Sequence, residues 1–246
     1  MAHRSRRMFD VCVIGTGAGG GVMIDELTRA GMSVVALERG PHVGHADFMA
    51  HDELSNIIRG TGFAPGLRET LRRSEDDTAT PRRFTMLGQC VGGSNVHWGA
   101  MSWRLRPDEF RALSQDGPIA GASLADWPVD AAEMAPWYDR AEAAYGVAGS
   151  AVHNALRPGK RYPNPPHPPR SGSHVFDRAV RKLGYTPFPI PLAINSRPYR
   201  NRAGCTNSGM CVMFGCPVDA KASPISVGLP RALATGRLDL RAESRV

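Results

Sequence analysis

The pattern of apolar and polar positions near the start of the chain predicts a strand, a helix and a second strand. Residues 11–14 form the unbroken apolar run Val-Cys-Val-Ile, which is typical of a parallel strand buried on both faces. Apolar residues then recur at helical spacing up to Gly31, which can end the helix. The predicted apolar stripe of this helix consists of Val22, Met23, Ile24, Leu27 and Ala30. A second apolar run over 33–37 completes the unit of a parallel α/β sheet.

The turn between the first strand and the helix is rich in glycine and has the spacing G-x-G-x-x-G. This first glycine loop consists of Gly15, Thr16, Gly17, Ala18, Gly19 and Gly20. Gly15 permits the tight turn, Gly17 lets the backbone approach a pyrophosphate, and Gly20 lets the helix pack on the strand. The free amide groups at the start of the helix point at the phosphates. The loop therefore predicts a dinucleotide site.

An acidic residue closes the second predicted strand. Glu38, followed by Arg39, stands where a carboxylate can accept hydrogen bonds from a ribose. Strand, glycine loop, helix, strand and acid follow one another in the order that a dinucleotide site requires. The residues themselves leave NAD and FAD open.

A second glycine loop, Gly92-Gly93-Ser94, comes later in the chain, and His97 and Trp98 follow it closely. Two adjacent glycines and a small hydroxyl residue let the backbone lie flat against a planar or phosphorylated ligand. A structural turn would explain the glycines. It would not explain the His-Trp pair in so tight a segment.

The two segments VIGTGAGGGVMIDELTRAGMSVVALERG and GQCVGGSNVHWGAMSWR together resemble the glucose-methanol-choline (GMC) family of FAD-dependent oxidoreductases, especially its sugar and polyol dehydrogenase flavoprotein subunits. The resemblance implies FAD as the cofactor. It also implies an α/β fold, with a doubly wound, Rossmann-like FAD-binding domain and an interleaved, incomplete second region. The expected activity is oxidation of CH–OH groups of sugars, polyols or alcohols, with hydride transfer to the flavin. The alternatives are a non-catalytic flavin and iron–sulfur electron-transfer module and an inactive truncated fragment.

The same resemblance assigns roles to single residues. It places Gly92, Gly93 and Ser94 along the flavin and its diphosphate, and it places the backbone of Val246 beside the adenine. His97 has three interpretations: a non-covalent contact with the flavin ring, a covalent bond to the flavin, or a hydrogen bond to backbone only. The resemblance covers the N-terminal half of a family enzyme, so the catalytic residues are expected in the other half and none in this chain.

Patterning along the rest of the chain predicts three regions. They are the first part of the FAD-binding domain at 1–110, an inserted helical and proline-rich region at 111–200, and a cysteine-rich loop that returns to the FAD-binding domain at 201–246. Expected elements are an irregular loop over 41–80, a helix from a capping box at Asp130 and Glu133 to Gly146, an extended strap over 160–170, a helix over 224–233 and a strand from 237 onward.

Three cysteines, Cys205, Cys211 and Cys216, lie close together in a loop rich in Gly and Asn, and Pro217 follows the third. Thiolates on such turns suit an iron–sulfur centre, and three ligands suit [3Fe–4S]. The resemblance implies such a cluster, which would pass electrons to a cytochrome or small partner subunit. Ser208 stands where related sequences often carry a middle cysteine. Free or structural thiols, zinc and a disulfide therefore stay open as alternatives.

Composition changes this picture little. Hydrophobic residues make up 42% and charged residues 22%, which is ordinary for a globular protein. The net charge of +7 comes from scattered arginines rather than from one basic patch, so a nucleic-acid partner is not expected. No apolar run approaches the ~20 residues of a membrane span, and the start shows no apolar signal-peptide core. These features favour a cytoplasmic location, or a periplasmic one if the chain is exported together with a partner subunit.

Overall fold

The computed structural model describes residues 8–44, 46–47, 54, 69–72, 74–82, 88–152, 154, 156, 159–209 and 211–246. The chain divides into two compact units. Unit 1 comprises 1–99 and 206–246, and unit 2 comprises 100–205. Each unit is described by itself.

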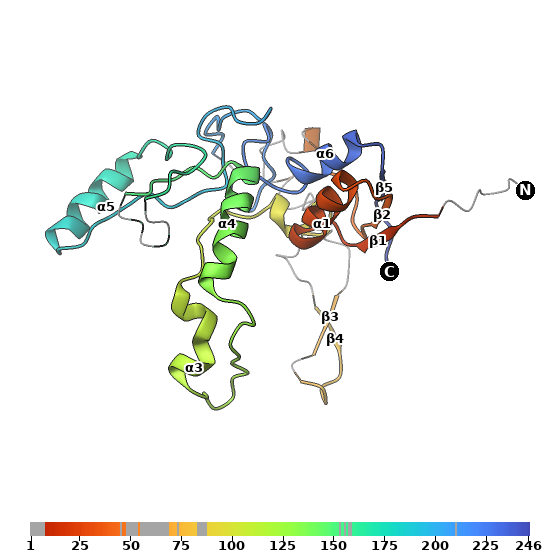
Figure 1. Cartoon of the computed structure of the whole chain (residues 1–246), viewed down its shortest axis with the longest axis horizontal. Coiled ribbons are helices and arrows are strands. Elements are labelled where there is room, and N and C mark those ends of the chain that lie inside the picture. The colour runs from red at the N-terminus through yellow and green to blue at the C-terminus, as the bar shows by residue number, and fades with distance from the viewer. Residues whose placement is uncertain are drawn as a thin grey trace, which may run out of the picture. The chain divides into compact units, whose positions relative to one another are not determined.

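Unit 1 contains a parallel sheet of three strands. Its order is β1 (Val11–Ile14), β2 (Val34–Leu37) and β5 (Leu238–Arg241), with β2 in the centre (Figure 1). In register, Val11 pairs with Val34 and Val34 pairs with Leu238. The strands predicted at 11–14 and 33–37 are therefore confirmed, and the α/β fold with them. The strand predicted over 237–246 is confirmed at 238–241 only, because β5 ends at Arg241.

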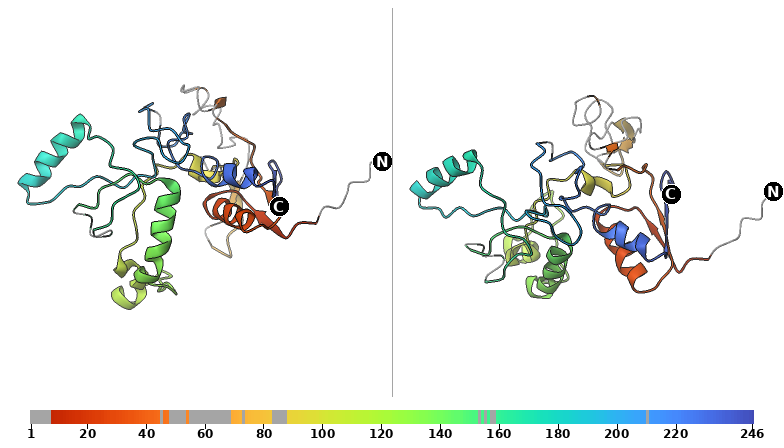
Figure 2. Two further views of the ribbon diagram at one scale, coloured as in Figure 1. Left: turned by 45° about the horizontal axis from the view of Figure 1, so that its top comes forward. Right: turned by 90° about the horizontal axis from the view of Figure 1, so that it is seen from above.

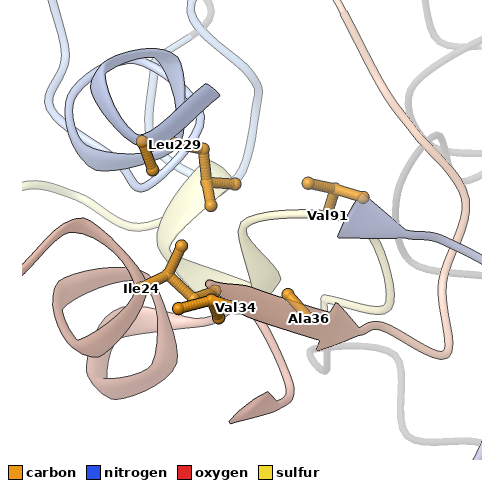
Figure 3. Packing of buried hydrophobic residues seen from close by; sticks show 6 residues of the cluster. Ile24, Val34, Ala36, Val91 and Leu229 are labelled. Carbon is orange, nitrogen blue, oxygen red and sulfur yellow. The ribbon is translucent and has the colours of Figure 1, made fainter. Parts of the chain in front are cut away.

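Two helices of unit 1 pack on each other beside this sheet. They are α1 (Ala18–Arg29) and α6 (Gly228–Ala234), and both views of Figure 2 show them side by side. A Cβ atom at Gly228 would lie 3.0 Å from the carbonyl oxygen of Gly21, so the absence of a side chain permits this close approach. The core cluster behind them is shown in Figure 3 and consists of Ile24, Val34, Ala36, Val91, Leu229 and Ala232.

Two helix predictions need correction. Val22 and Met23 were expected in the apolar stripe of α1, but they are 48% and 53% exposed, while Ile24 is fully buried. The later helix begins at Gly228 and not at Pro224. The Ser226 hydroxyl accepts a hydrogen bond from the Ser223 amide and donates to the Lys221 carbonyl, and such local side-chain bonds compete with helix formation.

A short antiparallel pair in unit 1 joins β3 (Glu69–Leu71) and β4 (Thr80–Arg82), with Thr70 opposite Pro81. The stretch 41–80, predicted as rich in loops with one short helix, contains β3, which the prediction missed; residues 48–53 and 55–68 of this stretch lie outside the described residues. The second glycine loop runs into a turn of 3₁₀ helix, η2 (Gly93–Val96).

The named elements of unit 2, among the residues that the structure describes, are all helices. They are η3 (Pro107–Arg111), α3 (Ala112–Asp116), α4 (Ala131–Tyr145) and α5 (Ser171–Lys182). The predicted capping box is confirmed, because Asp130 accepts from the amides of Ala132 and Glu133, and the Glu133 side chain accepts from the Asp130 amide. Gly146 ends α4 in the left-handed conformation, with φ of 70°.

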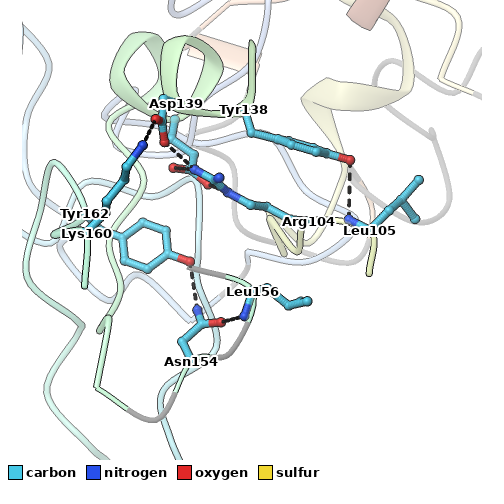
Figure 4. Close-up of polar contacts among 9 residues, drawn as sticks. Arg104, Leu105, Tyr138, Asp139, Asn154, Leu156, Lys160 and Tyr162 are labelled. Carbon is cyan, nitrogen blue, oxygen red and sulfur yellow. Dashed lines mark hydrogen bonds and ion pairs between the residues drawn. The ribbon is translucent and has the colours of Figure 1, made fainter. Parts of the chain in front are cut away.

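A buried ion-pair network anchors α4 within unit 2 (Figure 4). Arg104 donates from Nε and Nη2 to the two carboxylate oxygens of Glu142, each at 2.8 Å, and it also pairs with Asp139. Lys160 donates to the same Asp139 at 2.7 Å. The hydrogen bonds to Glu142 raise the pKa of Arg104, so this guanidinium stays charged. In the described part of the chain, no helix is long and apolar enough to span a membrane.

Candidate functional site

The first glycine loop has the geometry that its sequence predicts. Gly15 adopts φ of +85°, which favours glycine, and a Cβ atom at Gly20 would lie 2.0 Å from the Gly15 carbonyl oxygen. By contrast, a Cβ atom at Gly17 or at Gly19 would meet no atom within 4 Å. No side chain caps the N-terminus of α1, where Gly17 is the N-cap and Ala18 begins the helix. The first turn of α1 therefore has no side-chain cap, and no protein atom occupies the positions that side chains at Gly17 and Gly19 would take.

The second glycine loop lies directly against the first. A Cβ atom at Gly93 would stand 2.9 Å from the Cα atom of Gly17, so Gly93 must be glycine for the two loops to come this close. Gly92 and Gly93 adopt φ of 96° and 58°. The Ser94 hydroxyl accepts a hydrogen bond from the Gly88 amide at 3.0 Å. The structure thus brings together the two motifs that the sequence separates by more than seventy positions.

A buried polar chain ties the two loops to the end of β2. Oε2 of Glu38 accepts hydrogen bonds from the Thr16 amide at 2.9 Å and the Thr16 hydroxyl at 2.8 Å, and Oε1 accepts from the Gly40 amide at 3.0 Å. The same Thr16 hydroxyl accepts from the Gly92 amide at 2.9 Å. Thr16 is fully buried and Glu38 is 6% exposed. Glu38 therefore organises both loops, a role that the sequence did not indicate.

His97 and Trp98 continue from the second glycine loop and are held through their backbone and ring nitrogen. His97 is 5% exposed, and its carbonyl accepts from the Met213 amide at 2.7 Å. Trp98 donates from Nε1 to the Ala222 carbonyl at 2.8 Å. The three interpretations of His97 stay predictions. Arg39 is half-buried, and Val246 is 77% exposed.

The cysteine-rich segment contributes a buried cation that sequence reasoning missed. Lys221 is 2% exposed, and burial lowers its pKa, while the thiols of Cys211 and Cys216 oppose that shift. Cys205 belongs to unit 2, whereas the other two cysteines belong to unit 1. Among the residues that the structure describes, no three His, Cys, Asp or Glu side chains are arranged to hold a metal ion.

A small, mainly apolar pocket of about 200 Å³ lies in unit 1 next to the second glycine loop, since Val91 and Ile225 line it and both adjoin Gly92. Its lining residues include Val43, Val91, Ile225, Leu229, Leu233 and Leu240. Pockets for small molecules usually measure about 300–1,000 Å³, so this cavity alone does not accommodate a dinucleotide.

Comparison with known proteins identifies the relatives of this chain. No family model matches it. It is 33% identical over 241 residues to 6'''-hydroxyparomomycin C oxidase of Streptomyces lividus, covering 96% of this chain and 41% of the relative. It is 31% identical over 267 residues to the gluconate 2-dehydrogenase flavoprotein of Pantoea cypripedii, covering 94% and 43%. Further relatives bear the name GMC-type oxidoreductase.

The chain is a homologue of the GMC-type oxidoreductases. It spans about two fifths of the length of the curated relatives that it matches. Among solved structures, an FAD-dependent oxidoreductase from Chaetomium thermophilum superimposes with a TM-score of 0.52 at 15% identity, over 95% of this chain and 38% of that one. This likeness shows the fold. The resemblance to this family that the two glycine loops indicate is confirmed by the curated relatives.

Proposed function

We propose that this chain is the FAD-binding part of an oxidoreductase that oxidises hydroxyl groups of sugars, polyols or alcohols. Its relatives include named oxidases and dehydrogenases for such compounds, among them a gluconate 2-dehydrogenase flavoprotein and a 2-methyl-1,2-propanediol dehydrogenase. The observation that carries the proposal is the contact between the two glycine loops beside the uncapped start of α1.

The residues present fit the diphosphate and ribose of FAD. The open space at Gly17 and Gly19 admits a pyrophosphate against the amides of α1, where the helix dipole favours negative charge. A carboxylate offers about four acceptor sites. Glu38 uses three of them within the protein, which leaves capacity for a ribose hydroxyl.

In this proposal, bound FAD supplies the hydride acceptor for the oxidation. The chain holds the pyrophosphate at α1, lays the backbone of the second glycine loop along the cofactor, and sets His97 and Trp98 beside it. We further propose that the base that removes the hydroxyl proton belongs to the part of the relatives' length that this chain does not cover.

The test is FAD binding to the purified chain, measured by quenching of flavin fluorescence and by calorimetry, with NAD as the competing ligand. Gly17→Ala is the decisive variant, since its Cβ meets no protein atom and its φ of −65° suits alanine. It should fold normally and lose FAD affinity by about tenfold or more, because the methyl group occupies the space of the pyrophosphate. Gly172→Ala in α5 also meets no protein atom and is the matched control.

Two results would contradict this function. One is a wild-type chain that folds and binds neither FAD nor its adenosine diphosphate part. The other is a Gly17→Ala variant that binds FAD as tightly as the Gly172→Ala control. Preferred binding of NAD would redirect the proposal to a nicotinamide-dependent enzyme.

The [3Fe–4S] cluster and its electron-accepting partner remain a separate prediction for Cys205, Cys211 and Cys216. Its test is an assay of iron and acid-labile sulfide on anaerobically purified protein. About three irons per chain would support the cluster. Protein without iron would leave these residues as thiols.

A further inference from the structure

Lys221 places an ammonium group inside unit 1 among backbone oxygens. Its Nζ donates to the carbonyls of Phe214 at 2.7 Å, Cys211 at 2.8 Å and Trp98 at 3.0 Å. These three bonds use all three donors of the ammonium group. The acceptors come from two segments that lie far apart in the sequence. One is Trp98, and the other is the segment 211–214, which we name the cysteine turn.

A buried ammonium held by uncharged oxygens is costly, because carbonyl dipoles return less than a carboxylate would. An apolar side chain of similar length would avoid this cost, but it would leave the part-buried carbonyls of Trp98 and Phe214 without the lysine donor. The arrangement of Lys221 is therefore explained by the geometry that it imposes and not by a gain in stability from its charge.

The cysteine turn itself has a strained backbone. Met213 adopts φ of 69°, a conformation that few residues other than glycine adopt and that costs of order 1 kcal/mol or more. Its amide donates to the His97 carbonyl at 2.7 Å. The residue that follows Lys221 in the sequence, Ala222, accepts a hydrogen bond at its carbonyl from Nε1 of Trp98. The turn is thus joined to the His97–Trp98 segment by one direct hydrogen bond, from the Met213 amide, and by one bridge through the Lys221 ammonium group.

We propose that Lys221 is a positioning residue that fixes the cysteine turn against His97 and Trp98, and so sets one wall of the cofactor site. Val212 and Met213, which are 59% and 42% exposed, are the apolar side chains that this turn presents. The fixing of the turn follows from the contacts above, whereas the link to the cofactor rests on the proposed function.

Hydrogen exchange of single amides tests the first half of the proposal without any cofactor. In the wild-type chain, the Met213 amide should be protected although its side chain is exposed. In Lys221→Met, the amides of Met213 and Phe214 should exchange about tenfold faster, since each lost hydrogen bond is worth about 1 kcal/mol. The amides of β2 should keep their protection. Lys160→Met, which removes a lysine that pairs at the surface of unit 2, should leave all of these rates unchanged.

Three exchange results would overturn the proposal. They are a Met213 amide that exchanges like an open loop in the wild type, turn amides that keep their rates in Lys221→Met, and a loss of protection spread equally over the turn and β2. A Met213 amide that exchanges like an open loop in the wild type would refute the proposal even if the variant fails to fold.

Flavin binding tests the second half. If the wild type binds FAD, Lys221→Met should shift the flavin absorption bands or lower FAD affinity relative to Lys160→Met. If the turn amides of Lys221→Met exchange faster but its flavin absorption bands and FAD affinity are unchanged, the cysteine turn does not form a wall of the cofactor site. If the wild type binds no FAD, the proposed function fails, while the amide rates still decide the role of Lys221.

Discussion

Replacing Thr16 by valine should loosen the contact between the two glycine loops. Valine keeps the volume and the branched shape of threonine, and it removes only the hydroxyl group. That hydroxyl donates to Glu38 and accepts from the Gly92 amide in a fully buried position. The substitution therefore deletes two hydrogen bonds without opening a cavity.

The size of the destabilisation in Thr16→Val follows from the groups that lose their hydrogen-bond partner. The Gly92 amide would remain buried without its acceptor, which costs about 1–3 kcal/mol, and the loss of a bond to a carboxylate costs about 1.5–3 kcal/mol. Because both bonds end at one hydroxyl group, the two losses do not simply add. We expect Thr16→Val to lower the free energy of opening of unit 1 by about 2–4 kcal/mol.

The assay is native-state hydrogen exchange of the β2 amides, since one melting temperature is not defined for a chain of two units. Thr16→Ser is the matched control. It keeps both hydrogen bonds and loses one buried methyl group, which costs about 1 kcal/mol. If Thr16→Val destabilises unit 1 no more than Thr16→Ser does, the hydroxyl does not tie the loops together.

Three further predictions concern packing and charge. Leu229→Ala should lower the protection of β2 by about 2–5 kcal/mol in hydrogen exchange, because the side chain is 2% exposed in the core. Leu233→Ala on the same helix, at a position 50% exposed, should change it by a fraction of that amount. Arg104→Met should destabilise unit 2 by about 3–5 kcal/mol, since it strands a buried carboxylate, whereas Lys160→Met should cost about 1 kcal/mol or less in the same exchange measurement. Burial raises the pKa of Asp25 above its ordinary 3.8, so the folded unit retains this proton more strongly than the unfolded chain. The stability of unit 1 should therefore fall as pH rises from 3.8 through the folded-state pKa, and Asp25→Asn should remove that part of the pH profile; an unchanged profile would contradict the assignment.

The sequence predicted those features of the site that depend on local chemistry. A buried parallel strand needs a continuous apolar run, and a tight turn followed by an uncapped helix needs glycine at fixed positions. Residues 11–20 satisfy both requirements, and the structure gives them the expected geometry. The capping box at Asp130 was predictable for the same reason, because its two hydrogen bonds join residues three positions apart.

The features that the sequence did not predict depend on contacts between distant segments. Nothing in the neighbours of Lys221 shows that its ammonium group reaches the carbonyl of Trp98. Likewise, Val22, Met23 and Ile24 are all apolar, but consecutive side chains point about 100° apart around a helix, and of these three only Ile24 lies in the core with β2 and α6. Helical periodicity identifies an apolar face, but the width of the face that is covered depends on the partner elements.

The two loops and Glu38 are joined by hydrogen bonds within the protein, so the proposed cofactor site is assembled without a bound cofactor. Preorganisation lowers the entropy cost of binding. The apparent dissociation constant of FAD rises far above the intrinsic value only when the assembled state is a minor fraction of the population. Suppose that the loops open with a free energy of about 5 kcal/mol; a loss of about 2–4 kcal/mol in Thr16→Val would then raise exchange rates by about 30-fold to 1,000-fold. FAD affinity would fall by less than about twofold, because the assembled state would still dominate. A parallel fall of affinity and protection would mean instead that the loops are already largely open in the wild type. Measuring both quantities on the same variant therefore gives the free energy with which Thr16 and Glu38 hold the site closed.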